Sequence, residues 1–414
     1  MRMLWRAGAA LLLPAVAWCY SLPKEVIDLD LPPEVRWREF AQKYRSLIIE
    51  KATHMGRLYE VGIGPNATAR WLKAAPVDEV LMAEYKGIAS TVNSSDVTVD
   101  RLILTDMWQA VDAPTFECTG LLAAMANGTV IHGRNIDYDT AMMLKQALAA
   151  NVSLAGGAQF DGTFVRGGKP IVSFLAQIGS LGIHTGMRLG SWSFNSNARI
   201  FNNKMMDNLR ATEAGAQNFP WFARKVLEQV PDFESAVKAW ETVDLNAPNY
   251  FILAGSEPYQ GAVITRDRMG NHEASTPPTQ RLSAEEGIWH LVQTNDDLLS
   301  PPLDARREAA LTRLSVSLPS QVDEDFVQHE MLSSPVFNSD TLITWVANPR
   351  AGTHRVFPRD LGESTRGLIS KLIHKALRLP MPQDLGYDPA KDVPLAMVAK
   401  RSSLRTRQKS LRAA

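Results

Sequence analysis

Apolar residues recur at helical spacing through most of the first hundred residues. The segment 35–60 shows this spacing after an extended approach that two prolines hold straight, and the segments 69–90 and 97–111 repeat it. The pattern therefore predicts a mainly helical N-terminal part. No motif with recognisable chemistry occurs in this part of the sequence.

Beyond residue 117 the apolar runs shorten to strand length. The runs 119–125 and 129–138 flank Asn127-Gly128, the strongest short signal for a β-hairpin, because both positions of a two-residue turn need positive φ. Further strands are predicted at 163–167, 170–179, 182–187, 191–196, 250–255, 261–268 and 288–295, helices at 220–230, 233–243 and 303–318, and a closing hairpin at 341–358. Strands with helices between them indicate a layered α+β protein.

The first hairpin brings candidate chemistry together. A two-residue turn would place Cys118 directly opposite Asp137, and opposed residues have Cβ atoms about 4.5–5.5 Å apart, so a group on the cysteine could meet the carboxylate. The same register puts Arg134 on the other face of the strand, unless a bulge near Gly133 turns it inward.

Composition and charge narrow the class of protein. The 414 residues, 45% of them apolar, suit one large domain or two modest ones. The formal charges cancel, but residues 366–414 carry eleven Lys/Arg against three Asp. The remainder after residue 19 holds 31 basic against 41 acidic side chains. Nucleic acid is therefore not an expected partner, because binding phosphates needs clustered Lys and Arg.

The first residues resemble a secretory signal. Two arginines precede an apolar run, and the small residues Ala17 and Cys19 stand before a cut at Tyr20. We expect residues 1–19 to be removed and the protein to enter the secretory pathway, with the lysosome or the extracellular space as its destination. Four sequons supply candidate glycosylation sites, Asn66, Asn93, Asn127 and Asn151. Residues 363–414 are predicted to be a basic, partly disordered extension whose amphipathic stretch either is solvated or lies on a membrane surface.

Loss of the signal leaves Cys118 as the single cysteine, so no disulfide can form within the chain. A lone cysteine is commonly a small buried core thiol. A nucleophilic role would need a base, and the group of Cys118, Arg134 and Asp137 contains no histidine. The α-amino group of Cys118 could itself be the base if the chain is cut after Glu117. Asp137 would then hold the new ammonium group, and Arg134 would stabilise the thiolate. His132 is interpreted as structural.

Several motifs resemble one enzyme family. Cys118-Thr119, followed by HGRNIDY with Arg and Asp at +16 and +19, resembles the cholylglycine-hydrolase branch of the N-terminal nucleophile (Ntn) amidases. Within that branch it is similar to the acid ceramidase and N-acylethanolamine-hydrolysing acid amidase family. The likeness runs from about Val26 to Asp360 and includes IDLDLPPEVRW, HTGMRLGSWSFNSNAR, NYFILAGSEPYQGAVITRDR and VQTNDD followed by LDARR.

The resemblance implies an αββα Ntn-hydrolase sandwich with a small helical N-terminal subunit. Residues 20–117 would form the helical alpha subunit and residues 118–362 the catalytic beta subunit, separated by autocleavage between Glu117 and Cys118. The two parts would remain together as a heterodimer made from one precursor. The residues that the resemblance assigns to the active site are Cys118 as nucleophile, Arg134 and Asp137 as its polar partners, Asn295 in the oxyanion hole and Arg306 as a further arginine.

The oxyanion hole would also receive a backbone N–H from the loop at Asn197 and Ala198. This sequence departs from the family pattern at Gly120, where a serine is usual, and at Ala198, where an acidic residue is usual. Glu117 also stands where a neutral residue is common before the cut.

The implied activity is hydrolysis of the amide bond of N-acyl lipids. Ceramide is the first expected substrate, giving a sphingoid base and a fatty acid, and N-acylethanolamine is the second. No metal or other cofactor is expected, and contact with a membrane or a lipid-presenting protein could deliver the substrate. The competing hypothesis is an uncleaved, non-catalytic lipid-binding relative, which Glu117 and Ala198 would favour.

Overall fold

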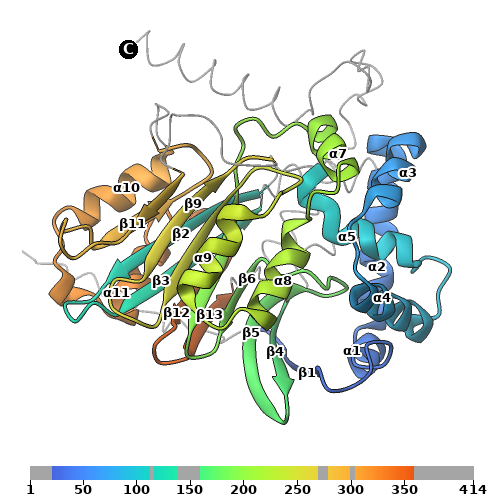
Figure 1. Ribbon diagram of the computed structural model, residues 1–414, viewed down its shortest axis with the longest axis horizontal. Helices are drawn as coiled ribbons and strands as arrows, with labels where there is room; N and C mark the ends of the chain where they lie inside the picture. Colours follow the sequence, from blue (N-terminus) through green and yellow to red (C-terminus); the bar gives the residue numbers. More distant parts are fainter. Residues whose placement is uncertain (1–20, 112–115, 139–158, 269–277, 299–303, 359–414) are drawn as a thin grey trace, which may run out of the picture.

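Two stacked β-sheets form the centre of the molecule, and helices cover their outer faces (Figure 1). The computed structural model describes residues 21–111, 116–138, 159–268, 278–298 and 304–358. The predicted signal 1–19, the basic extension 363–414 and the sequon at Asn151 lie outside the described residues.

The N-terminal part is helical, as predicted. Its elements are β1 (Lys24–Asp28), α1 (Arg38–Lys43), α2 (Arg45–Arg57), the π-helical turn η1 (Leu58–Ile63), α3 (Pro65–Ala74), α4 (Glu79–Val92) and α5 (Val99–Val111). The predicted segment 69–90 is two helices instead of one. Pro76 disfavours a helical Ala75, and the Asp78 side chain accepts the N–H of Leu81 at 2.8 Å, which starts α4 afresh.

Thirteen strands of the described chain form an eight-stranded and a five-stranded sheet. The eight-stranded sheet has the order β1-β4-β5-β6-β7-β8-β9-β10, with β4 (Gln159–Arg166), β5 (Lys169–Gln177), β6 (Thr185–Arg188), β7 (Trp192–Ala198), β8 (Asn249–Gly255), β9 (Gly261–Arg266) and β10 (Thr279–Arg281). The five-stranded sheet has the order β11-β2-β3-β12-β13, with β2 (Phe116–Ala124), β3 (Val130–Tyr138), β11 (His290–Gln293), β12 (Thr341–Asn348) and β13 (Thr353–Pro358). Strand β1 pairs with β4 in parallel, so the N-terminal part contributes an edge strand.

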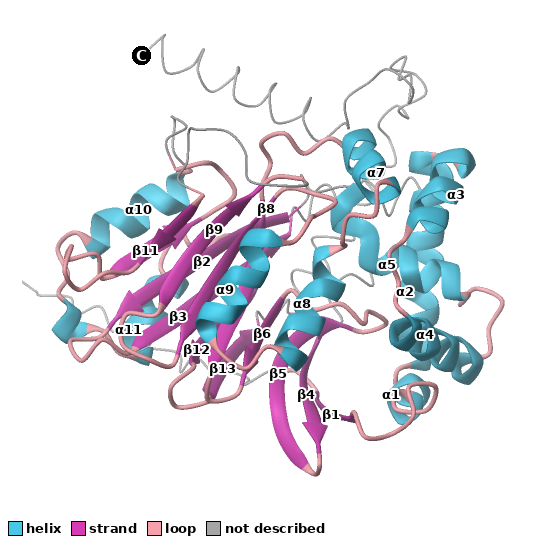
Figure 2. Ribbon diagram, viewed as in Figure 1, coloured by secondary structure: helices cyan, strands magenta, loops and turns pink. Residues whose placement is uncertain are grey.

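The remaining helical elements are α7 (Met205–Glu213), α8 (Phe219–Gln229), α9 (Phe233–Thr242), α10 (Ala305–Leu314), the 3-10 turn η3 (Pro319–Gln321) and α11 (Glu324–Leu332). Helices α8, α9, α10 and α11 lie on the outer faces of the sheets, whereas α7 packs against α3 and α5 (Figure 2). Trp240 of α9 stacks on Phe251 of the eight-stranded sheet with ring centroids 4.0 Å apart. On the other side Met331 of α11 packs in one cluster with Ile131 of β3. Leu122 and Ile252 meet between the two sheets. The layers are therefore αββα, as the resemblance implied.

The register of the first hairpin differs from the prediction by one residue. Cys118 lies opposite Ile136 rather than Asp137, because the turn contains three residues instead of two. The N–H of Gly128 donates to the carbonyl of Met125 at 2.8 Å, and Gly128 alone in this turn has a positive φ, of 82°. This is a type I turn closed by a left-handed glycine.

The corrected register changes which residues share a face. Arg134 now lies opposite Gly120 and on the same face as Cys118, so no bulge at Gly133 is needed. A bulge does occur next to Asp137, but it lies in the neighbouring strand β12, between Thr341 and Ile343.

Candidate active site

Cys118 lies on the inner face of β2, between the two sheets, and is 2% exposed. Its backbone N–H donates to Oδ1 of Asn295 at 2.8 Å. Asn295 follows β11, the neighbour of β2 in the sheet, and this adjacency brings the two residues together. Nη2 of Arg306 donates to the same Oδ1 at 3.0 Å, while Nδ2 of Asn295 donates to the carbonyl of Ala198 at 2.8 Å. The donors on Oδ1 thus fix the orientation of the amide.

Arg134 places its guanidinium beside the sulfur. Nη2 lies 3.4 Å from Sγ of Cys118 and donates to the carbonyl of Ser196 at 2.8 Å. Nη1 donates to the carbonyl of His184 and the hydroxyl of Thr185. These contacts span β2, β3, β6 and β7. The guanidinium is therefore fixed beside the buried sulfur of Cys118.

Arg306 connects the remaining predicted residues. It lies in the first turn of α10, where the Asp304 side chain accepts its backbone N–H at 2.9 Å and caps the helix. Its Nη1 donates to Oδ2 of Asp137 at 2.9 Å, and Asp137 is fully buried. Cys118, Asn295, Arg306 and Asp137 therefore form one continuous set of contacts. The Asp137 carboxylate contacts the arginine from the side of β3 that faces away from Cys118 in the strand register.

Asn197 and Ala198 end strand β7 rather than occupying a loop. The Asn197 side chain donates to the carbonyl of Gln293 at 2.8 Å and lies 3.4 Å from the carbonyl of Cys118. Ala198 presents its carbonyl to Asn295. Both residues thus lie next to Cys118 or to Asn295, and Asn197 reaches the carbonyl of Cys118 with its side chain.

A series of hydrogen bonds between buried polar side chains lies next to Cys118 and was not predicted. Nε2 of His132 lies 2.6 Å from Oδ1 of Asn195, whose Nδ2 donates to Oδ1 of Asn197 at 2.9 Å. Burial lowers the pKa of His132 to about 3, so the ring is neutral and holds its place in the chain by hydrogen bonds. A Cβ on Gly120 would lie 3.2 Å from Cγ1 of Ile252 and 3.3 Å from Oδ1 of Asn195, so a larger residue there would require these neighbours to shift slightly.

A buried ion pair next to the site was also missed. Nε and Nη2 of Arg199 donate to both oxygens of Asp297, each at 2.8 Å, and the Tyr250 hydroxyl adds a third bond at 2.6 Å. Arg199 follows Ala198, and Asp297 comes two residues after Asn295. The pair therefore ties the two segments that border Cys118. The sequence contains Arg199 directly after Ala198 and Asp297 close to Asn295, but no pattern in it indicates that Arg199 and Asp297 pair.

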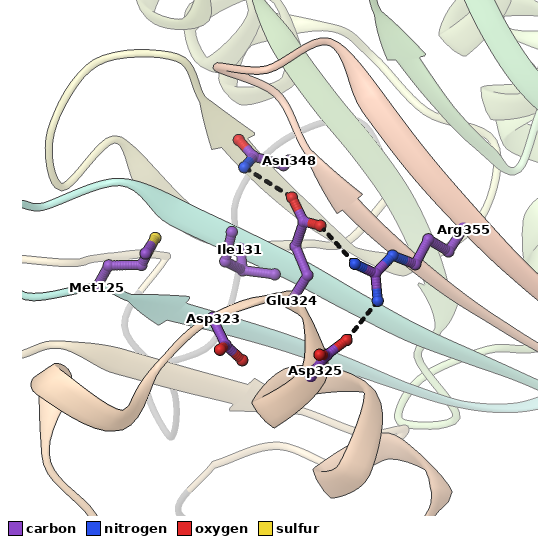
Figure 3. Close-up of a pocket in the computed structure, with 7 residues that line it drawn as sticks. All are labelled: Met125, Ile131, Asp323, Glu324, Asp325, Asn348 and Arg355. Atoms are coloured by element: carbon purple, nitrogen blue, oxygen red, sulfur yellow. Dashed lines mark hydrogen bonds and ion pairs between the residues drawn. The ribbon is translucent and has the colours of Figure 1, made fainter.

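Other candidate features lie apart from this site. Asn66, Asn93 and Asn127 are exposed. Figure 3 shows a pocket on the outer face of the five-stranded sheet, where Glu324 receives hydrogen bonds from Asn348 at 2.9 Å and Arg355 at 3.0 Å. Among the helices that the structure describes, none is long and apolar enough to cross a membrane. Within the described ranges no group of three or more His, Cys, Asp or Glu side chains is arranged to hold a metal ion.

The Glu117–Cys118 peptide bond lies inside β2, which begins at Phe116. The structure is thus that of the uncut chain. Glu117 pairs with Asp137 through the backbone, so the expected cut would remove two residues from the start of the strand.

The chain is similar to known proteins of two kinds, acid ceramidases and N-acylethanolamine-hydrolyzing acid amidases. Residues 20–59, which precede Cys118, match a family model described as the beta subunit of N-acylethanolamine-hydrolyzing acid amidase. Acid ceramidase from Homo sapiens is 26% identical, over 82% of this chain and 87% of its own length. N-acylethanolamine-hydrolyzing acid amidase from Caenorhabditis elegans is 28% identical, over 78% of this chain and 88% of its own.

A solved structure resembles the fold as well. It is that of the Caenorhabditis elegans N-acylethanolamine-hydrolyzing acid amidase ortholog, with a TM-score of 0.50 and 27% identity. The alignment covers 58% of this chain and the whole of that one. Taken with the αββα layers and the residues gathered around Cys118, these similarities support the acid ceramidase and N-acylethanolamine-hydrolyzing acid amidase family of Ntn hydrolases as the family that the chain resembles in sequence and fold.

Proposed function

We propose that this chain is a cysteine amidohydrolase that cleaves the amide bond of N-acyl lipids. The observation that carries the proposal is the pair of contacts at Cys118, with Arg134 3.4 Å from the sulfur and Asn295 bound to the backbone nitrogen. These groups suit a nucleophile that attacks a carbonyl carbon. The names of the relatives, acid ceramidase and N-acylethanolamine-hydrolyzing acid amidase, support lipid amides as the substrate class.

The enzyme is activated by its own nucleophile. Sγ of Cys118 attacks the carbonyl carbon of Glu117, and the bond between that carbon and the Cys118 nitrogen breaks as the acyl group moves to sulfur. The nitrogen takes up the proton that the thiol loses. Water then hydrolyses the thioester, which leaves a carboxylate on Glu117 and a thiol and free amine on Cys118. The products are an N-terminal subunit, residues 20–117, and a catalytic subunit that begins at Cys118.

The freed amine is the general base for substrate turnover. It accepts the thiol proton as Sγ attacks the amide carbonyl, and it returns the proton to the leaving amine before water hydrolyses the acyl-thioester. Asn295 and a backbone N–H near Ala198 stabilise the oxyanion. Oδ1 of Asn295 already binds the Cys118 nitrogen in the uncut chain, so the same contact orients the new amine. Arg306 holds Asp137 and Asn295 in one arrangement.

Ceramide is the first substrate choice and N-acylethanolamine the second, because the N-terminal and TGMR segments are most similar to acid ceramidase. The substrates reach the enzyme from a membrane or a lipid-presenting protein. The signal-like residues 1–19 and the exposed sequons support a secretory route, to the lysosome or the extracellular space.

The test compares the purified wild-type chain with Cys118→Ala. The proposal expects two fragments of the wild type on a reducing denaturing gel, with one beginning Cys-Thr-Gly, and one intact band for the variant. The cleaved form should hydrolyse ceramide or N-acylethanolamine of the same acyl chain. A wild type that stays whole and binds lipid without turnover would instead establish the non-catalytic relative. Cleavage without hydrolysis of either lipid would refute the substrate class.

A further inference from the structure

One of the oxygen atoms that hold Arg134 belongs to the connection between β5 and β6. Residues 178–184, here called the β5–β6 connection, end in His184, whose carbonyl accepts from Nη1 of Arg134, and the hydroxyl of the next residue, Thr185, accepts from the same nitrogen. The position of this connection therefore decides where the guanidinium lies relative to Sγ of Cys118.

The middle of the β5–β6 connection is bound by the N-terminal part. Oδ2 of Asp106, on α5, accepts the backbone N–H of Leu181 at 2.8 Å and that of Gly182 at 3.1 Å. The same oxygen also accepts from the Tyr85 hydroxyl and, at 3.2 Å, from Nε1 of Trp221. Asp106 is 3% exposed, so its Oδ2 accepts these four hydrogen bonds inside the protein.

The start of the connection is bound by a second side chain of the N-terminal part. Nζ of Lys51, on α2, donates to Oε1 of Gln177 at 2.7 Å and to the hydroxyl of Ser180 at 3.0 Å. The far side is closed by α8, because a Cβ on Gly182 would lie 2.5 Å from Cβ of Pro220. The connection thus has little room to move while the Asp106 and Lys51 side chains are in place.

We propose that Asp106 and Lys51 are positioning residues for Arg134, so that the part of the chain before the cut sets the guanidinium beside the nucleophile of the other subunit. The inference rests on the proposed function, which makes Cys118 the nucleophile. It also gives the N-terminal subunit a role after cleavage. Loss of either contact lets the β5–β6 connection and the His184 carbonyl shift, and a displacement of about 1 Å at a catalytic group can cost about 100-fold in rate.

A matched control lies at the same interface. Glu84 of α4 accepts from Nη1 and Nη2 of Arg224, on α8, at 2.5 and 2.7 Å, and is fully buried. Glu84 therefore joins the N-terminal part to the rest of the chain as Asp106 does. Glu84 is hydrogen-bonded to Arg36 and Arg224, neither of which lies in the β5–β6 connection.

The experiment measures the rate of alkylation of Cys118 by iodoacetamide at pH 6. The full chain carries Cys19→Ser, so that one thiol remains. Asp106→Ala and Lys51→Met are expected to slow alkylation about tenfold and to lower kcat without changing KM. Asp106→Asn, whose amide oxygen can still accept from the connection, should recover most of the rate. Glu84→Gln should lower the melting temperature, but its alkylation rate should equal that of the parent chain.

Two outcomes would overturn the inference. The first is an alkylation rate in folded Lys51→Met and Asp106→Ala that equals the rate of the parent chain. The second is an equally slowed alkylation in Glu84→Gln, which would mean that the interface has loosened as a whole. Lys51→Met alone decides the matter if Asp106→Ala does not fold. Because alkylation needs no substrate, a chain that hydrolyses no lipid amide would refute the proposed function and leave this test intact.

Discussion

The backbone N–H of Cys118 donates to Oδ1 of Asn295 at 2.8 Å, although 177 residues separate them. Arg306 donates to the same oxygen, so Nδ2 of Asn295 faces the carbonyl of Ala198. These contacts therefore hold three other segments around Cys118 in the uncut chain.

Asn295→Asp should test this arrangement with almost no change in shape. The new carboxylate keeps an acceptor for Cys118 but puts an oxygen against the Ala198 carbonyl and removes the amide donor. We expect kcat on an N-acyl lipid to fall by about 10²–10³, the usual cost of an oxyanion donor, with little change in KM. A kcat within threefold of the wild type would contradict the role of Asn295.

Arg306→Lys should separate charge from geometry. A lysine keeps the positive charge but cannot reach Asp137, Asn295 and Asp304 with fixed, forked donors as the arginine does. We expect at least a tenfold loss of kcat/KM in steady-state assays. Arg313→Lys is the control, because Arg313 lies on the same helix and pairs with Glu330 away from the site. Equal losses in both variants would mean that α10 matters only as a whole.

The sequence predicted the elements better than the contacts between them. Period-two and helical patterns located the hairpin of β2 and β3 and the helices α5, α8, α9 and α10. Helix α11 was missed because its sequence, EDFVQHEML, is mostly polar, and its burial comes from Val327 and Met331 packing on β3. The register failed because the turn length depends on the φ angle of one residue, Asn127, which periodicity does not reveal.

The candidate site residues were predicted through resemblance rather than through spacing. No local pattern indicates that Arg306 meets Asp137, since 169 residues separate them and the contact depends on how α10 lies against β3. Asp106 and Lys51 were not recognised at all. In an amphipathic helix a charged residue is ordinarily read as part of the solvated face, and only the packed structure places these two against the β5–β6 connection.

Gly128→Ala should weaken the hairpin that carries Cys118. The turn needs a φ of 82° at this position, and a Cβ there would lie 2.6 Å from Cβ of Pro258. Gly167→Ala is the matched control, because its φ is also positive, 58°, but no atom lies within 4 Å of its added Cβ. We expect strain of about 1 kcal/mol in the control and a larger loss of unfolding free energy in Gly128→Ala, measured by urea denaturation. Equal losses of unfolding free energy in the two variants would show that Pro258 moves aside without a cost.

His184→Phe should make the fold less sensitive to acid. Burial, with Arg134 and Lys51 nearby, lowers the pKa of His184 to about 3, against 6.5 for an ordinary histidine. As the pH falls from about 6.5 towards 3, the unfolded chain binds a proton that the folded chain does not, so stability falls by at most about 1.4 kcal/mol per pH unit for this residue. Above pH 6.5 the residue contributes no pH dependence.

Phenylalanine removes this titration while it keeps a ring against Phe219, which packs edge-on with the imidazole at 5.2 Å. The His184 carbonyl that binds Arg134 belongs to the backbone and remains. Urea midpoints at pH 7 and pH 4 should therefore differ less in the variant than in the wild type. The variant will not be wholly insensitive, because burial also lowers the pKa of His132 to about 3 and that residue still titrates in the unfolded chain. An identical loss of stability in both proteins would mean that His184 takes up its proton in the folded state.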